Sequence, residues 1–166
     1  MLVILEGNEC NYKTTVAEKL SKKTGMSIIK GSSFEQSKFT NEKLFNNFKE
    51  ILSLKNTIVD RYIFSNLVYA SLYDDYSIIN TLQREIIESE LIKNESVVVY
   101  LYSDVDVLSY RLGNRGDDYV KQDKLQAIND KYSEVLSETT VPILHVNTKS
   151  VSSTFIANYI YKLIKT

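Results

Sequence analysis

Residues 2–15 read LVILEGNECNYKTT, an apolar run that leads directly into a turn and then into a lysine and two threonines. The loop that holds nucleotide phosphates in many proteins has the pattern G-x-x-x-x-G-K-[ST]. Gly7, Lys13 and Thr14 stand at the required spacings, but Tyr12 replaces the second glycine. The stretch therefore predicts a strand, a phosphate-binding loop and the start of a helix, with one departure from the pattern.

In such a loop, backbone N–H groups surround the phosphates and the N-terminus of the following helix adds its dipole. A side chain at position 12 requires either a negative φ or a strained backbone, whereas Asn11 tolerates a left-handed conformation better than most residues. We expect the ring of Tyr12 to point away from the phosphates, because the loop binds through its main chain. The residues expected to contact the nucleotide here are Gly7, Asn8, Asn11, Tyr12, Lys13, Thr14 and Thr15.

The composition favours an ordinary globular protein. The 166 residues fit a single domain, with 43% hydrophobic and 25% charged residues and a net charge of −1. This charge balance predicts neither a nucleic-acid nor a membrane partner, and no apolar window has the length of a membrane span. The single Cys10 cannot form an internal disulfide, so we expect a reducing, cytoplasmic environment.

Apolar β-branched runs alternate with segments of helical periodicity along the whole chain. This alternation predicts a three-layer α/β fold, in which a five-stranded parallel sheet is covered by helices on both faces. In such sheets, ligands bind beyond the carboxyl ends of the strands. The predicted strands are 2–6, 27–30, 57–60, 97–102 and 142–147, and the periodic helical segments are 14–23, 42–54, 77–93, 124–136 and 152–164.

The third predicted strand ends in Asp60, and Arg61 follows it. An aspartate at this place is suited to hold Mg²⁺ beside a phosphate loop. The planar guanidinium of Arg61 is suited to bind a second phosphate. The alternative is structural: Asp60 caps the next helix and Arg61 pairs with a surface carboxylate.

A helix after the fourth strand carries Arg111 and Arg115, and a polar segment with two glycines surrounds its end. Arginines at i and i+4 share one helix face. The segment from about 112 to 123 is therefore predicted to be a lid that brings positive charge onto a transferring phosphoryl group. A solvated helix face with Arg–Asp pairs is the alternative.

Three motifs in order carry a resemblance to a known family. They are the strand–GxxxxxKTT–helix stretch, VDRYxxSxxVY at 59–69, and YLYSDVDVLxxRLxxRGDDY at 100–119. Together they resemble the thymidylate kinase family of P-loop nucleoside monophosphate kinases, which is related in fold to the deoxynucleoside kinases. The resemblance spans residues 2 to about 165, and it implies the P-loop nucleotide kinase fold.

The resemblance implies a role for each matching position. On the donor side, Lys13 and Thr14 would bind the phosphates of ATP and Mg²⁺, Asp60 would lie near the metal, and Arg111 and Arg115 would be the lid arginines. Arg111 would also stack near the donor adenine. On the acceptor side, the implied residues are Arg61 for the monophosphate, Ser65 and Tyr69 for the nucleoside, and Phe45 or Phe48 for the base, although the spacing of these two also suits the core.

Two further positions depart from the family pattern. The family has an Arg-Glu-Pro-Gly segment after the second strand, where this chain has Lys30-Gly31-Ser32-Ser33-Phe34-Glu35. Lys30 offers a point charge in place of the arginine fork. Ala70 stands where the family commonly has a glutamine that contacts the base, so the base of the acceptor is not fixed by the sequence.

The leading hypothesis is an ATP- and Mg²⁺-dependent kinase that phosphorylates a (deoxy)nucleoside monophosphate, with a pyrimidine such as dTMP or dUMP as the expected acceptor. One alternative is a deoxynucleoside kinase, which needs a general base for a neutral hydroxyl; Glu35 is the nearest candidate. Another is a non-catalytic nucleotide-binding module with Tyr12 as the lesion. The resemblance also implies a possible homodimer. His145, on the last predicted strand, is expected to have a structural role.

Overall fold

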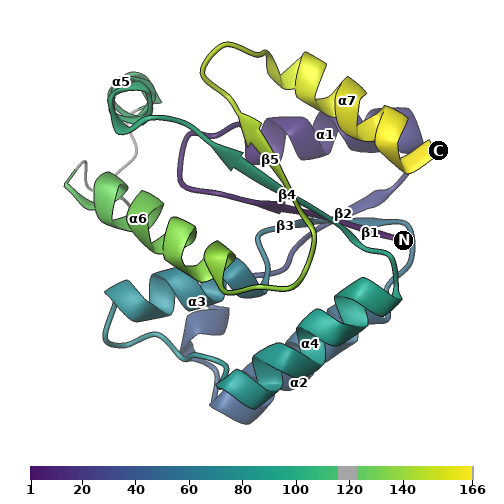
Figure 1. Cartoon of the computed structure of the whole chain (residues 1–166), viewed down its shortest axis with the longest axis vertical. Helices are drawn as coiled ribbons and strands as arrows, with labels where there is room; N and C mark the ends of the chain where they lie inside the picture. The colour runs from purple at the N-terminus through teal and green to yellow at the C-terminus, as the bar shows by residue number, and fades with distance from the viewer. Residues whose placement is uncertain (116–122, 166) are drawn as a thin grey trace.

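The protein, described here by a computed structural model of residues 1–115 and 123–165, is a three-layer α/β structure (Figure 1). Its five strands are all parallel and lie in the order β2-β3-β1-β4-β5. The strands are β1 (Leu2–Glu6), β2 (Ser27–Lys30), β3 (Thr57–Asp60), β4 (Val97–Tyr102) and β5 (Ile143–Asn147). The predicted fold class is confirmed, and the predicted strands agree with these bounds to within one residue.

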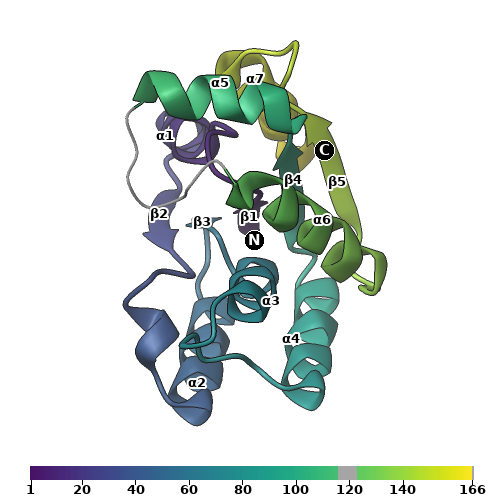
Figure 2. The ribbon, with the colours of Figure 1, turned by 90° about the vertical axis from the view of Figure 1, so that its left-hand side faces the viewer.

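Helices cover both faces of the sheet. They are α1 (Lys13–Thr24), α2 (Asn41–Leu52), α3 (Ile63–Leu72), α4 (Thr81–Lys93), α5 (Val105–Arg115), α6 (Lys124–Ser137) and α7 (Ser153–Lys165), and a 3₁₀ turn spans Gln36–Lys38. The pair α1 and α7 packs on one face, while α2, α3, α4 and α6 lie on the other (Figures 1 and 2). Among the described residues, no helix is both long and apolar enough to cross a membrane.

Two hydrophobic cores hold these layers together. The smaller core joins α1 and α7 to the sheet through residues such as Val16, Leu20 and Ile156, all fully buried. The larger core joins the other helices to the opposite sheet face. Strand β1, in the middle of the sheet, is buried along its whole length, as expected for a parallel strand that is covered on both faces.

The start of α4 differs from the sequence prediction. Periodicity predicts a helix from residue 77, but α4 begins at Thr81. Asn80 caps it, because the Asn80 side chain accepts from the backbone N–H of Gln83 and the Gln83 side chain accepts in return from that of Asn80. The segment before α4 is bound to another part of the chain, since the Ser77 N–H donates to the Ser37 carbonyl at 2.7 Å.

The sheet register brings the expected chemistry to one edge. Asp60 at the end of β3 pairs with Leu5 of β1 on one side and with Lys30 of β2 on the other. Three strands therefore end at the same level, and the loop after β1 begins there. This is the edge at which α/β sheets bind ligands.

Candidate active site

The loop between β1 and α1 has a backbone that only glycine permits at its first position. Gly7 has φ 141°, and a Cβ built on it would lie 2.1 Å from the carbonyl oxygen of Leu101. The loop is also tied to α6, because Asn8 Nδ2 donates to the Leu125 carbonyl and to Asn129 Oδ1, both at 2.9 Å. These buried contacts fix the loop before any phosphate binds.

Tyr12, in the place of the second glycine, retains the backbone conformation of a glycine. Its φ is 63° and its ψ 11°, which is the left-handed region. Of the two possibilities predicted for this position, a negative φ or a strained backbone, the structure has the strained backbone. The non-glycine residues of the loop with positive φ are Cys10 and Tyr12, whereas Asn11, whose residue type tolerates that conformation better, is not among them. A tyrosine side chain on this left-handed backbone adds strain to the loop.

Lys13 begins α1 and is held inside the loop. Its side chain is buried, with 6% of the residue exposed, and Nζ donates to the Asn8 carbonyl at 2.6 Å. Burial lowers the pKa of Lys13 to about 8, and the nearby charge of Arg61 acts in the same direction. An ammonium group in this position is stabilised when an anion enters the loop.

Thr14 and Asp60 meet at the mouth of the loop. Thr14 Oγ1 donates to Asp60 Oδ2 at 2.9 Å. The other carboxylate oxygen, Asp60 Oδ1, is buried and accepts no hydrogen bond within the described residues. One hydroxyl and one under-used carboxylate oxygen fit the preference of Mg²⁺ for a few protein oxygens, with phosphate oxygens and water completing its shell. These two residues would hold the ion.

Arg61 lies across the loop from Lys13 and also has a left-handed backbone, with φ 65°. Its Nη1 donates to the Gly7 carbonyl at 3.0 Å and to the Tyr69 hydroxyl at 3.1 Å, and Nη2 forms an ion pair with Glu9. Burial alone would raise the pKa of Glu9, but the charges of Arg61 and Lys13 hold it below its ordinary value. Glu9 was not among the site residues predicted from the sequence.

Ser65 is part of a buried network at the end of β1. Its hydroxyl and its N–H both donate to the carboxylate of Glu6, which also accepts from the Tyr62 N–H at 2.9 Å. Burial raises the pKa of Glu6 in spite of these donors. Ser65 borders the cleft, but its hydroxyl is occupied within the protein.

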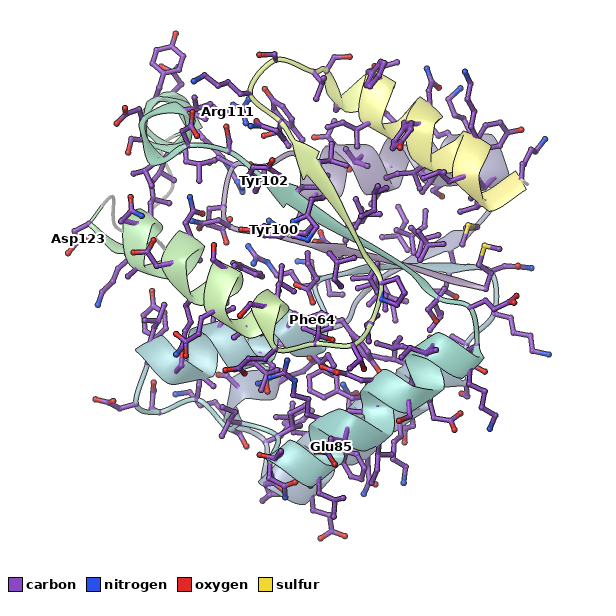
Figure 3. All side chains as sticks on the ribbon, in the orientation of Figure 1. Phe64, Glu85, Tyr100, Tyr102, Arg111 and Asp123 are labelled. Carbon is purple, nitrogen blue, oxygen red and sulfur yellow. The ribbon has the colours of Figure 1, made fainter. Side chains whose placement is uncertain are left out.

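Arg111 connects α5 to the phosphate loop and to the loop after β5 (Figure 3). Its Nη1 donates to the Cys10 carbonyl at 3.2 Å and to Thr148 Oγ1 at 2.9 Å, and its Nη2 donates to the Thr148 carbonyl at 2.7 Å. Its guanidinium carbon lies 4.3 Å from the centre of the Tyr12 ring. The expected lid arginine is thus already in contact with the loop.

Arg115 is one helical turn further along. It is 60% exposed at its side chain, and Nη1 lies 4.0 Å from Glu9 Oε2. Of the lid expected at 112–123, residues 116–122 lie outside the described residues.

A cleft of about 1290 Å³ joins these groups. It is lined by residues of the phosphate loop and Arg111, by Lys30 and Arg61, and by a set of aromatic side chains, which are Phe34, Tyr69, Tyr73 and Tyr76. Phe45 does not line it: the ring packs against the core, with Lys49 Nζ 5.1 Å from its centre. Phe48 is fully buried.

Comparison with known proteins identifies the family. The model of the thymidylate kinase family matches residues 39–154. The chain belongs to the thymidylate kinase family. The predicted resemblance is confirmed, although the match begins after the phosphate loop, so the loop is assigned by its own geometry.

Relatives of this thymidylate kinase family member include YorR, an SPbeta prophage-derived uncharacterized protein of Bacillus subtilis, which is 44% identical over 164 residues and 99% of each chain. The crystal structure of YorR in complex with phosphorylated GDP has a TM-score of 0.94 at 43% identity, covering 99% of this chain and 96% of YorR. Thymidylate kinase from Candida albicans (20% identity, TM-score 0.59, 99% and 90% covered) and deoxyadenosine kinase from M. mycoides with bound dATP (16%, 0.66, 100% of both) share the fold.

Three residues of the site were not predicted from the sequence. Glu9 was missed because its ion-pair partner Arg61 lies 52 residues away in the sequence, and Thr148 because it follows a strand and is not part of a motif. Phe34 could have been found from the sequence, since it is a large aromatic residue in a polar segment shortly after β2. The same segment begins with Gly31, where a Cβ would lie 2.3 Å from Val59 Cγ1.

Proposed function

We propose that the chain is an ATP- and Mg²⁺-dependent kinase that transfers the γ-phosphoryl group of ATP to a nucleoside monophosphate. The observation that carries this proposal is one cleft with cationic groups at both ends. We take the phosphate loop with Lys13 as the donor end and the side with Lys30 and Phe34, after β2, as the acceptor end. Arg61 lies between them, bound to Glu9 of the loop and to the Tyr69 hydroxyl. Cations supplied both by the phosphate loop and by the ends of β2 and β3 suit two phosphate-bearing substrates better than one.

The carboxylates of the cleft support a charged acceptor. Among the described lining residues these are Glu9, Asp60 and Asp75. Glu9 is paired with Arg61 and Asp75 with Lys38, while Asp60, whose Oδ1 has no hydrogen-bond partner among the described residues, is assigned to Mg²⁺. Glu35, the base considered for a deoxynucleoside kinase, does not line the cleft. A neutral hydroxyl acceptor would need a carboxylate free to take its proton, whereas a phosphate oxygen is already ionised near neutral pH.

The mechanism follows from these positions. An oxygen of the acceptor monophosphate attacks the γ-phosphorus in line, the bond to the bridging β–γ oxygen breaks, and ADP leaves with that electron pair. Lys13 and the loop N–H groups stabilise the charge on the donor phosphates, and Arg61 holds the acceptor phosphate. When bound, Mg²⁺ supplies charge neutralisation between the donor phosphates. The protein thus contributes position and charge rather than covalent chemistry.

The base of the acceptor is the finer part of the proposal. The family favours a thymidylate-like pyrimidine, dTMP or dUMP. A guanine nucleotide is the second candidate, because YorR was crystallised with phosphorylated GDP. Phe34, Tyr73 and Tyr76 line the acceptor end, and aromatic faces stack with either kind of base.

The test is a panel of nucleoside monophosphates and nucleosides incubated with ATP and Mg²⁺, with ADP release as the measurement. The panel contains dTMP, dUMP, dCMP, dGMP, GMP, dAMP, thymidine and deoxyguanosine. Turnover of at least one monophosphate and of neither nucleoside is expected. Turnover confined to nucleosides would replace the proposal with a deoxynucleoside kinase, and ATP binding without any turnover would favour a non-catalytic module.

A further inference from the structure

The backbone at Tyr12 is costly for the residue that occupies it. A left-handed φ of 63° brings the Cβ of tyrosine close to the following carbonyl, a contact that glycine avoids. Strained residues of this kind persist where their surroundings hold them, and they concentrate at functional sites. The strain at position 12 therefore indicates that the tyrosine ring has a function that glycine could not supply.

The ring of Tyr12 packs against the smaller core and contacts one described cation, the guanidinium of Arg111. The guanidinium carbon lies over the ring, 4.3 Å from its centre. Thr148 holds the same guanidinium from another side through its hydroxyl and its carbonyl. Thr148 is itself fully buried and donates to Asn11 Oδ1 at 2.9 Å. Arg111 is thus fixed by one ring and by polar groups from the loops after β1 and β5.

We propose that Tyr12 is a positioning residue for the donor nucleotide, whose ring sets the plane of the Arg111 guanidinium for contact with the donor base. Both side chains line the donor end of the cleft. Tyr12 directly precedes Lys13, so the orientation of the arginine is coupled to the loop that holds the phosphates. This inference rests on the proposed function, because it assigns the donor end of the same cleft.

The consequence is a donor site that is arranged before ATP arrives. A cation over an aromatic face is attracted by the ring electrons, and a guanidinium held in one plane loses less freedom when a base stacks on it. In a chain with glycine at position 12, Cys10 and Thr148 would still bind the guanidinium, but no ring would fix its plane before the nucleotide arrives. The ring therefore acts mainly on donor binding and little on phosphoryl transfer.

The experiment compares Tyr12→Phe with Tyr12→Gly. Phenylalanine keeps the ring, whereas glycine removes it and fits φ 63° without strain, so the loop backbone is retained. ATP affinity is measured by calorimetry without acceptor, and KM and kcat are measured with the best monophosphate. Tyr110→Ala is the matched control, because Tyr110 adjoins Arg111 in the sequence but is 74% exposed.

We expect Tyr12→Gly to weaken ATP binding and raise the ATP KM by about tenfold, within the range of a desolvated cation–π contact, while kcat and the acceptor KM stay within about twofold. Tyr12→Phe and Tyr110→Ala should match the wild type. In an Arg111→Met background, Tyr12→Gly should add no further loss, since its effect acts through that arginine.

The inference would be overturned by an ATP affinity of Tyr12→Gly equal to that of the wild type, or by an equal loss in the presence and absence of Arg111. A merely structural role would lower kcat and the melting temperature together, and this also contradicts it. Because ATP binding is measured without acceptor, failure to phosphorylate any monophosphate would contradict the proposed function alone and leave the comparison of Tyr12 variants decisive.

Discussion

The two ends of the cleft are built differently. At the donor end, Asn8, Asn11 and Thr148 are fully buried, and Lys13 is nearly so. Each makes hydrogen bonds within the protein. At the acceptor end, Lys30 is exposed and Phe34 is 57% exposed. The donor end is therefore held by buried hydrogen bonds, whereas the acceptor end includes side chains that are exposed to solvent.

This difference has a physical consequence for specificity. In a preformed site, the side chains lose their conformational entropy during folding. In an exposed site, they lose it when the ligand binds, which weakens binding. Arg61 stands between the two, because it is buried but paired with Glu9. We therefore expect donor recognition to be strict and acceptor recognition to be more tolerant, and the following experiments separate the two ends.

The largest effect is expected from Lys13→Ala. Loss of the ammonium removes charge stabilisation of the donor phosphates in a buried site, so kcat should fall by about 10²- to 10³-fold. Steady-state phosphoryl transfer is the measurement. Lys93→Ala is the matched control, because this lysine is 72% exposed at its side chain on α4. Unchanged transfer by Lys13→Ala would overturn the assignment of the whole loop.

Asp60→Asn should be the next most severe change. The amide keeps the shape of the side chain but loses the charge that would hold Mg²⁺, and kcat should fall by about a hundredfold. The variant should also need a higher Mg²⁺ concentration for half-maximal rate, which a titration of Mg²⁺ measures. Asp130→Asn, an exposed change on α6, serves as control. An unaltered Mg²⁺ requirement would show that Asp60 is structural.

Arg61→Lys tests the acceptor end. Lysine retains the charge but lacks the planar fork, and a lost charged hydrogen bond of about 1.5–3 kcal/mol corresponds to about a ten- to hundredfold rise in the acceptor KM. The ATP KM should stay within about twofold. Initial rates at varied acceptor and fixed ATP, and then the reverse, give both constants. Equal rises in both would mean that the two ends are not separate.

The smallest effect is a pH dependence at the donor end. The pKa of Lys13 is lowered to about 8, and bound phosphates favour its charged form. ATP affinity should therefore fall as pH rises through about 8, by about tenfold between pH 7 and pH 9, with uptake of a proton on binding. Calorimetry in buffers of different ionisation enthalpy measures both. Lys13→Arg stays charged, so its affinity should be flat over this range.

The fold could be predicted from the sequence because its signals are local. Apolar β-branched runs and helical periodicity each lie within a few consecutive residues, and the register of parallel strands then brings Lys30 and Asp60 to one level. The start of α4 could not be predicted, because its boundary depends on a capping residue, Asn80, and on contacts of the preceding segment with Ser37.

The candidate site was predictable only where a motif marks it. Lys13, Thr14 and Asp60 lie together as expected. Glu9 could not be predicted, because its role depends on the ion pair with Arg61, which lies 52 residues away in the sequence. The left-handed backbone of Tyr12 could not be predicted from its residue type, since tyrosine disfavours this conformation and the surrounding structure imposes it.

Cys10 gives the phosphate loop a practical property. It is the single cysteine of the chain, half-buried, and it borders the cleft. Burial raises the pKa of its thiol, so the reactive thiolate is scarce at neutral pH and more abundant in alkaline buffer. A maleimide dye added there would label each chain once, beside the nucleotide, without any engineered residue. The native sequence thus supplies an attachment point for following occupancy of the cleft by fluorescence.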